Sequence, residues 1–251
     1  MLSNLIMAIN RTFTLGVGTT PEPAVQAFAP VDDIRSLLAR GKNAVSSGTP
    51  LKEIRFVVMD TETTGFYPYR GDEVISLGAV VVQGGRIREE ETFHQLVNPG
   101  RHVPQVVTDL TGITDGMVAA APDFFTILRD FLSFAGDSVL VGHALDFDMA
   151  FFNLKLKKRC RNQIRHLTLD TYKMSFLVDP FLHNRSLDGL LASHGIPGTG
   201  RHTAIGDAIL TARLLLVFLD ILAGCHITTL QDMREALHHQ YLQLAGRAQL
   251  V

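Results

Sequence analysis

The sequence predicts an α/β fold in which a mixed sheet carries helices on both faces. Three strand-like stretches come first; the first is a continuous apolar run, and the second is rich in Val and Ile. After residue 100, apolar residues recur mostly at helical spacing, interrupted by two short strand-like runs. Strands followed by alternating helices and strands are typical of a sheet with helices packed on both sides.

The three early stretches predict an antiparallel meander. Phe56–Met59 is a continuous apolar run, as expected of a strand that is covered on both faces. Gly84 and Gly85 separate Val74–Val82 from Arg86–Val97, which predicts a hairpin. The third stretch carries charges on one side, so we expect it to be the more exposed strand.

The later part of the chain predicts five helices and two short strands. The helix at 204–222 is apolar nearly all round and is therefore expected to be central. The predicted helices cover 105–111, 123–134, 147–158, 186–194 and 204–222, and the predicted strands cover 138–142 and 167–169.

Composition divides the 251 residues into three parts. Residues 1–50 form an N-terminal extension with a short amphipathic helix near Val31–Leu38, expected to pack on the main domain rather than on a partner. Residues 51–224 form the main domain. Residues 225–251 form a C-terminal helical extension that starts at the capping box Thr229–Asp232.

Charge and cysteine content exclude several classes. A formal net charge of −2 means that contact with a nucleic-acid backbone has to be local. Cys160 and Cys225 lie far apart, which indicates neither a zinc site nor a disulfide framework and favours a cytoplasmic setting. Leu5–Ile9 is too short to span a membrane and has no signal-peptide pattern, so no membrane partner is expected. An amphipathic segment that touches a membrane is the alternative for these residues.

Two carboxylates follow the first predicted strand. Asp60 and Glu62 are one residue apart, so on a strand they point to the same face. Such like charges repel unless a cation lies between them, and oxygen ligands of this kind suit Mg²⁺ or Mn²⁺. For this pair alone, a solvated acidic turn is the alternative.

Further ionisable residues occur where later strands end and helices begin. Asp148 opens one helix, Asp207 lies in the first turns of another, and His202 precedes Asp207 by five residues. Functional groups of α/β sheets gather at such an edge. Asp146 competes with Asp148, and a favourable contact with the helix dipole is the alternative role for each acidic residue.

Together these residues resemble the three motifs of the DnaQ-like 3′→5′ exonucleases. The histidine of the third motif corresponds to the DEDDh branch, which includes the ε proofreading subunit of bacterial DNA polymerase III. The resemblance covers roughly residues 54–222 and implies a ribonuclease H-like fold. Its motifs are Asp60-x-Glu62-Thr-Thr-Gly65, His143-x-x-x-Phe147-Asp148 and His202-x-Ala204-x-x-Asp207.

The resemblance implies a catalytic centre with two divalent cations, Mg²⁺ or Mn²⁺. Enzymes that cleave phosphodiesters commonly hold two such ions ~3.5–4 Å apart. His202 is then the candidate general base, because histidine titrates near neutral pH. The implied metal ligands are Asp60, Glu62, Asp148 and Asp207, with Asp60 as the bridge.

The resemblance also implies a site for the 3′-terminal nucleotide. Gly65 can adopt a positive φ and so bring backbone close to the ligand. Phe66 is expected to stack on a base, with a core position as the alternative. The implied substrate-binding residues are Thr63, Thr64, Gly65, Phe66, Leu110, Thr111 and His143.

Three further features bear on the prediction. The family usually has His-Asn-Ala where this chain has His143-Ala144-Leu145, which predicts retained activity with an altered substrate preference. Asp170 is expected to be structural. The arginines at 159, 161 and 165 and the nearby lysines form a basic run that could follow a phosphate backbone; a solvated helix end is the alternative.

The expected activity is metal-dependent 3′→5′ hydrolysis of single-stranded DNA ends, with release of nucleoside 5′-monophosphates, in proofreading or repair. RNA 3′-end trimming is the alternative, because the same carboxylates serve both and only contacts to the 2′-OH set sugar choice. A nuclease-like polymerase-binding module without catalysis is the alternative from another class. It predicts loss of a ligand or of the base, and all five residues are present. A DNA polymerase subunit, or a second copy held through the terminal helices, is the expected protein partner.

Overall fold

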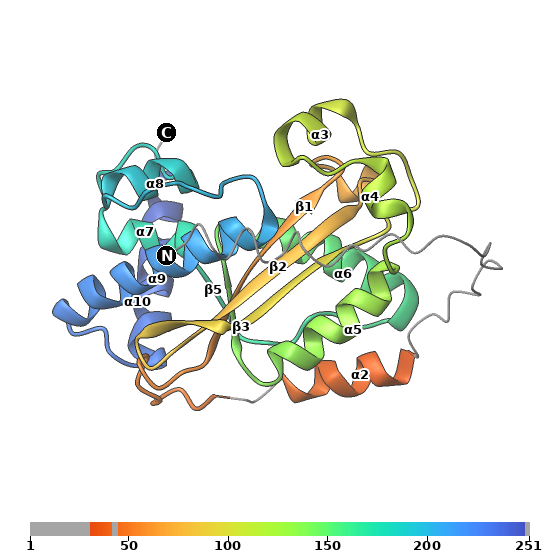
Figure 1. Cartoon of the computed structure of the whole chain (residues 1–251). Coiled ribbons are helices and arrows are strands. Elements are labelled where there is room, and N and C mark those ends of the chain that lie inside the picture. Colours follow the sequence, from red (N-terminus) through yellow and green to blue (C-terminus); the bar gives the residue numbers. More distant parts are fainter. Residues whose placement is uncertain (1–30, 42–44, 249–251) are drawn as a thin grey trace, which may run out of the picture.

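A five-stranded mixed sheet organises the computed structural model, which describes residues 31–41 and 45–248 (Figure 1). The strand order is β3-β2-β1-β4-β5; β1, β2 and β3 pair antiparallel, whereas β4 and β5 run parallel to β1. The predicted meander is therefore present. The strands are β1 Phe56–Thr63, β2 Val74–Gln83, β3 Arg86–Leu96, β4 Val139–Gly142 and β5 Thr168–Asp170.

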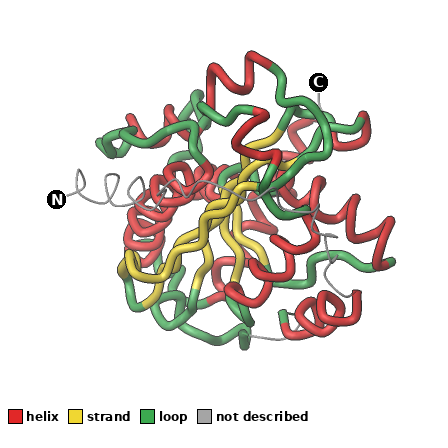
Figure 2. The backbone as a smooth tube through the Cα atoms, turned by 45° about the vertical axis from the view of Figure 1, so that its right-hand side comes forward, coloured by secondary structure: helices red, strands yellow, loops and turns green. Residues whose placement is uncertain are grey.

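Helices cover both faces of this sheet, as predicted (Figure 2). The short helices η1, α4 and α7 were not expected from the sequence. The helices are α2 Val31–Arg40, η1 Pro68–Arg70, α3 Gln105–Thr111, α4 Asp115–Ala119, α5 Phe124–Ala135, α6 Asp146–Cys160, α7 Thr171–Val178, α8 Leu187–Ser193, α9 Ala204–Gly224 and α10 Leu230–Ala248.

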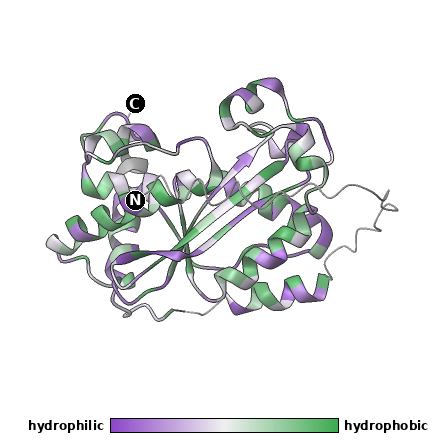
Figure 3. Ribbon diagram, in the orientation of Figure 1, coloured by the Kyte–Doolittle hydropathy of each residue, from purple (hydrophilic) through white to green (hydrophobic). Residues whose placement is uncertain are grey.

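The central strand β1 is buried on both sides. Val57 and Met59 belong to the core on one face, and Phe56 and Val58 belong to the core on the other. This alternation follows from the two-residue period of a strand, and hydrophobic residues run along the central strands in Figure 3. β1 continues beyond the predicted Phe56–Met59, because β2 pairs with it as far as Thr63.

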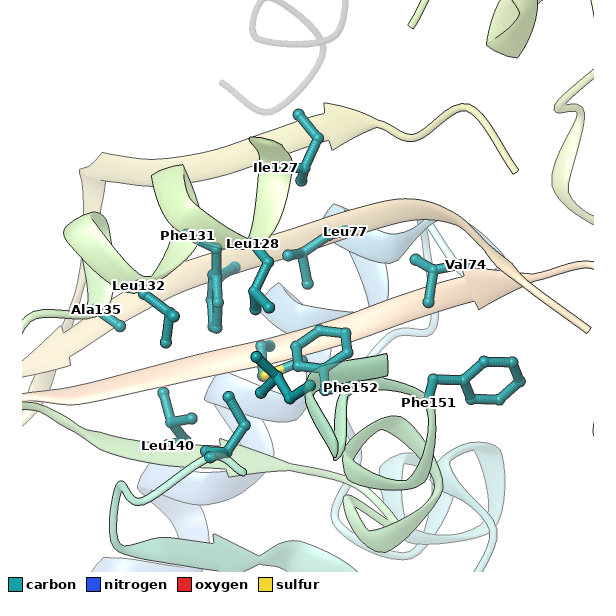
Figure 4. Packing of buried hydrophobic residues seen from close by; sticks show 14 of the residues in the cluster. Val74, Leu77, Ile127, Leu128, Phe131, Leu132, Ala135, Leu140, Phe151 and Phe152 are labelled. Atoms are coloured by element: carbon teal, nitrogen blue, oxygen red, sulfur yellow. The ribbon is translucent and has the colours of Figure 1, made fainter. Parts of the chain in front are cut away.

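One core lies between the sheet and the helices α2, α5 and α6. Figure 4 shows its tightly packed centre, in which Phe131 and Leu132 of α5 meet Phe152 of α6 and Leu140 of β4. Helix α2 adds the fully buried Ile34 and Leu38 and packs along α5 and α6. The prediction that this N-terminal helix packs on the main domain is confirmed.

The second core lies on the opposite face, beneath α7, α8, α9 and α10. Helix α9 contacts β1, β2 and β3, so its predicted central place is confirmed. The first turn of α10 adds the buried Leu230 and Met233 to this core. The division of the chain near residues 51 and 224 stays a prediction.

Close backbone contact brings the start of α9 onto the sheet. Gly78 of β2 is the register partner of Asp60, and a Cβ at Gly78 would overlap the backbone of Ala204 and Ile205. A residue without a side chain is therefore required where the helix meets the strand. This contact between Gly78 and the backbone of α9 sets the distance between the first turns of α9 and the end of β1.

The outer regions complete the description. β3 is the exposed edge strand that its charges predicted. The expectations made for residues 1–30 lie outside the described residues. Within the described residues, no helix is both long enough and apolar enough to cross a membrane.

Candidate active site

Three carboxylates from two distant segments meet at one edge of the sheet. Asp60 and Glu62 lie inside β1, rather than just past it as expected, and share one face. Asp207 reaches them from the fourth residue of α9. One carboxylate oxygen from each of the three residues lies within 4.8 Å of the others, an arrangement that could hold a metal ion.

The start of α9 is fixed by its sequence. Thr203 caps the helix, and its hydroxyl accepts a hydrogen bond from the amide of Gly206 at 3.1 Å. Gly206 is needed there because a Cβ would overlap the carbonyl oxygen of Gly200. The capped first turn therefore presents Asp207 to β1 in a defined position.

Asp148 lies beside this cluster, in the first turn of α6, where its charge raises the pKa of Asp60. Its side chain is buried, with the residue 4% exposed, and the hydroxyl of Thr61 on β1 donates to its Oδ1 at 2.5 Å. The competing Asp146 points outward: its side chain is 82% exposed and pairs with Lys173 Nζ at 2.7 Å. The structure therefore brings Asp148, and not Asp146, towards Asp60.

Burial raises the pKa values of all four carboxyl groups, and repulsion by the other carboxylates of the group adds to this for Asp60 and Glu62. Desolvation is the largest cause for each; the pKa of Asp60 lies well above its usual value, and the charges of Asp148, Asp207 and Glu62 raise it further. The pKa of Glu62 and that of Asp148 both rise to about 7. Asp207 shifts in the same direction. Without a cation, the cluster holds protons that a divalent ion would displace.

The donor set fits a hard divalent cation. Oδ1 of Asp207 is buried and has no hydrogen-bond partner among the described residues. Leaving a buried acceptor unsatisfied is costly, and a bound ion would remove that cost. Since every ligand atom in the cluster is a carboxylate oxygen, Mg²⁺ and Mn²⁺ suit it better than softer metals.

Arg201 is the component that sequence reasoning missed. Its guanidinium pairs with Asp207, and Nε also donates to Asp188 Oδ1 at 2.6 Å. Its positive charge lowers the pKa of Asp60 and Glu62 and so partly opposes their repulsion. Its position directly before the third-motif histidine was the available signal.

His202 follows in an unusual backbone conformation. Its φ is 63°, in the left-handed region that non-glycine residues rarely occupy. It is half-buried, and its imidazole lies close enough to Asp207 and Asp188 for its charge to lower the pKa of both. The conformation is held between Gly200, which also has a positive φ, and the cap Thr203.

A second histidine lies at the end of β4. His143 Nδ1 is 3.0 Å from the hydroxyl of Thr171, and burial lowers the pKa of His143 to about 4. Asp170 accepts hydrogen bonds from the amides of Ala144, Leu145 and Tyr172 at 2.9, 3.1 and 2.9 Å. Asp170 is therefore structural, as expected, and it supports Ala144, whose φ is 55°.

The turn after β1 presents Phe66 to solvent. Phe66 is 76% exposed, and its ring centroid lies 6.1 Å from that of Phe147 in α6, so the alternative of a core position is wrong. Gly65 could adopt a positive φ but is not among the residues that have one. A Cβ at Gly65 would overlap the carboxylate of Asp72, which would then have to shift.

The neighbouring threonines are engaged within the turn. The hydroxyl of Thr63 donates to the carbonyl of Gly65 at 2.7 Å. Thr64 is buried; its hydroxyl donates to Asp72 Oδ1 at 3.2 Å and accepts from the amide of Glu73 at 3.0 Å. These contacts fix the shape of the turn beside Phe66.

The remaining expected substrate residues lie in α3. Leu110 is exposed, whereas the hydroxyl of Thr111 donates to the carbonyl of Val107 at 2.8 Å. The segment around α3 packs on Ile75 of β2, which is adjacent to Ser76, the register partner of Glu62. This packing places α3 near the end of the sheet at which the carboxylates lie.

Comparison with known protein families shows which family the chain belongs to. A family model described as exonuclease matches residues 57–215, which is more than half of the chain. The chain belongs to this exonuclease family, and the resemblance inferred from its motifs is confirmed.

Named relatives narrow the comparison. The chain is 39% identical over 165 residues to the DNA polymerase III subunit epsilon of Aquifex aeolicus, covering 66% of this chain and 80% of that protein. It is 41% identical over 198 residues to a DNA polymerase III subunit epsilon-like protein of Rhodobacter capsulatus, covering 77% of this chain. It spans only 28% of the length of the latter.

A solved structure shares the fold. The nuclease domain of 3'hExo, a DEDDh family member bound to rAMP, superposes with a TM-score of 0.59 at 20% identity, covering 68% of this chain and 94% of that one. The predicted ribonuclease H-like mixed sheet is confirmed by this match.

Proposed function

We propose that this protein is a 3′→5′ exonuclease that hydrolyses single-stranded DNA ends and releases nucleoside 5′-monophosphates. One observation carries the proposal: Asp60, Glu62 and Asp207 converge within 4.8 Å beside the buried Asp148. Burying several carboxylates near one another is costly unless a cation compensates their charge. The family membership and the ε relatives support the same reaction.

In this proposal Asp60, Glu62, Asp148 and Asp207 would hold two divalent cations, Mg²⁺ or Mn²⁺. When bound, such ions lower the pKa of the attacking water and offset negative charge on the leaving oxygen. Thr61 keeps Asp148 in place through its 2.5 Å hydrogen bond. The close contact at Gly78 and the helix cap at Thr203 position Asp207 beside the carboxylates of β1.

His202 is the proposed general base. It would accept the proton of the attacking water at its imidazole, beside Asp207. Its strained backbone is consistent with a functional constraint, because such conformations cluster at active sites. Arg201 adds a fixed positive charge at the side of the cluster, where an anionic phosphate would arrive.

The terminal nucleotide is proposed to bind between the turn after β1, α3 and the end of β4. Phe66 offers an exposed ring for stacking on a base, and Leu110 offers an exposed apolar contact. Thr63, Thr64 and Gly65 shape the turn, since the hydroxyls of both threonines are already bonded. Further contacts are assigned to Thr111 and His143, the latter neutral at physiological pH because of its lowered pKa.

The biological setting proposed is proofreading or repair of DNA. The names of the ε relatives support DNA over RNA and association with a DNA polymerase subunit. The extensions at residues 1–50 and 225–251 are the proposed contacts for such a subunit or for a second copy of the chain.

End-labelled strands test the proposal. With Mn²⁺ or Mg²⁺, the protein should release a 3′ label from single-stranded DNA in the first step of the reaction and should shorten a 5′-labelled strand stepwise. The addition of EDTA should stop both reactions. Asp60→Ala should abolish the reaction, whereas Asp146→Ala, outside the cluster, should retain it. Retention of the 3′ label under all metal conditions would exclude a nuclease. Faster shortening of RNA than of matched DNA would exclude the proposed substrate.

A further inference from the structure

A basic surface extends away from the active site along α6. Between Asp148 and Asp170 the sequence has no acidic residue and six Lys or Arg residues, although the whole chain has a formal charge of −2. The side chains of Lys157, Lys158 and Arg161 are exposed and make no ion pair or hydrogen bond within the described part of the chain. The concentration of charge is therefore local.

An exposed aromatic residue lies beside these cations. Tyr69 of η1 is 79% exposed and lines two hollows, of about 640 and 610 Å³. Lys158 lines the first hollow, and Lys157 and Arg161 line the second. Cations at the C-terminal end of a helix are stabilised by the helix dipole, but that role requires no exposed aromatic residue beside them. The helix dipole alone therefore does not explain why Tyr69 lies next to these cations.

The surface is continuous with the proposed terminal-nucleotide site. Phe66 directly precedes Tyr67 and η1, and the ring of Phe66 packs on Phe147 in the first turn of α6. Helix α6 then leads from Asp148 to Lys158, which is ~15 Å at the rise of an α-helix. Stacked nucleotides are ~3.4 Å apart along one strand, so this length matches about four phosphates.

We propose that this surface, which we call the α6 track, binds the strand just upstream of its 3′-terminal nucleotide. Tyr69 stacks on a base, and Lys157, Lys158 and Arg161 contact successive phosphates. Alternating cations and aromatic rings are the usual means of holding a single strand without reading its sequence. The inference rests on the proposed exonuclease function and adds a second binding region to it.

Hydrolysis of substrates of graded length tests the α6 track. The substrates are the p-nitrophenyl ester of thymidine 5′-monophosphate, which occupies only the active site, and oligo(dT) of two, four, six and ten nucleotides. For the unchanged protein, kcat/KM should rise with length up to about six nucleotides and then level off.

The variant Lys157→Gln/Lys158→Gln/Arg161→Gln should lose this dependence on length. Three lost phosphate contacts should lower kcat/KM on the ten-nucleotide strand by on the order of 10- to 100-fold at 0.1 M salt and reduce the slope of log kcat/KM against log salt by about 2. Hydrolysis of the ester should be unchanged. Tyr69→Ala should weaken only the oligonucleotide reactions, about fivefold or more.

A matched variant controls for net charge. Lys52→Gln/Arg86→Gln/Arg234→Gln removes three exposed cations from elsewhere on the fold; Lys52 and Arg86 lie near the end of the sheet where β1 begins, opposite the carboxylates. It should behave like the unchanged protein. The α6 track is wrong if the first variant keeps the length and salt dependence, or if it loses ester hydrolysis equally. Failure of the unchanged protein on every substrate, ester included, would instead reject the exonuclease function.

Discussion

Gly78→Ala should disable the carboxylate cluster without unfolding the protein. Gly78 lies opposite Asp60 in the β1–β2 register, and a Cβ there would overlap the backbone of Ala204 and Ile205. The obstacle is backbone, so no side-chain rotation relieves it. The first turn of α9 must move away from β2, and Asp207 moves with it.

The size of the displacement follows from the overlap. Restoring an ordinary contact of ~3.5 Å between carbon atoms requires the helix to retreat by about 1 Å. A misplacement of that size at a catalytic centre costs about 100-fold in rate. The overpacking should also lower the free energy of unfolding by about 1–3 kcal/mol.

Three measurements on Gly78→Ala check this reasoning: kcat/KM on an oligonucleotide, Mn²⁺ affinity by calorimetry and stability in urea. Gly224→Ala is the matched control, because Gly224 ends the same helix and a Cβ there meets nothing within 4 Å. It should keep full activity. Wild-type rate and wild-type Mn²⁺ affinity in Gly78→Ala would refute the proposed link between this contact and the position of Asp207.

Three further predictions concern the same site. Thr61→Val removes the hydrogen bond to the buried Asp148 and should weaken Mn²⁺ binding about 10- to 100-fold in a titration. The control variant Thr126→Val removes an equally short hydrogen bond to Asp123 and should leave Mn²⁺ binding unchanged. Ala144→Gly should raise the free energy of unfolding in urea by about 0.5–1 kcal/mol, because φ is 55° at Ala144; no gain would mean that the strain is absent. The pKa values of Glu62 and Asp148 in the folded protein are raised to about 7, so the folded metal-free protein binds more protons than the unfolded chain. Its free energy of unfolding should therefore fall as pH rises from about 5 to 7. A rise in this free energy across the same range, measured by unfolding in EDTA, would contradict the raised pKa values.

The positions of the four carboxylates were predictable because each follows from local chain geometry. The i, i+2 spacing puts Asp60 and Glu62 on one face of a strand, and Asp148 and Asp207 occupy the first turns of helices that follow strand ends. The preference for Asp148 over Asp146 came from motif spacing. The structure supplies its physical basis in the buried contact with Thr61.

Features that depend on distant partners were not predictable. Arg201 enters the site because Asp188, thirteen residues away in sequence, holds the other side of its guanidinium. The space for a side chain at Gly65 is limited by the carboxylate of Asp72 and not by the φ of Gly65. Each of these requirements exists only once the chain has folded.

The secondary structure likewise divides into elements that local sequence patterns predict and elements that depend on contacts elsewhere in the fold. The long periodic helices α5, α6 and α9 were expected close to their observed bounds. Helix α7 was missed because Thr171–Val178 has no clear apolar stripe. β1 runs on to Thr63 because pairing with β2 satisfies its backbone, which no pattern within β1 reveals.

Mn²⁺ titration of the metal-free protein tests the central claim, that carboxylates from β1, α6 and α9 form one divalent-cation centre. Calorimetry should give two bound ions per chain for the unchanged protein. Asp60→Asn should abolish at least one of them, whereas Asp146→Asn should retain both. Absence of Mn²⁺ binding to the unchanged protein, or unaltered binding to Asp60→Asn, would contradict the account.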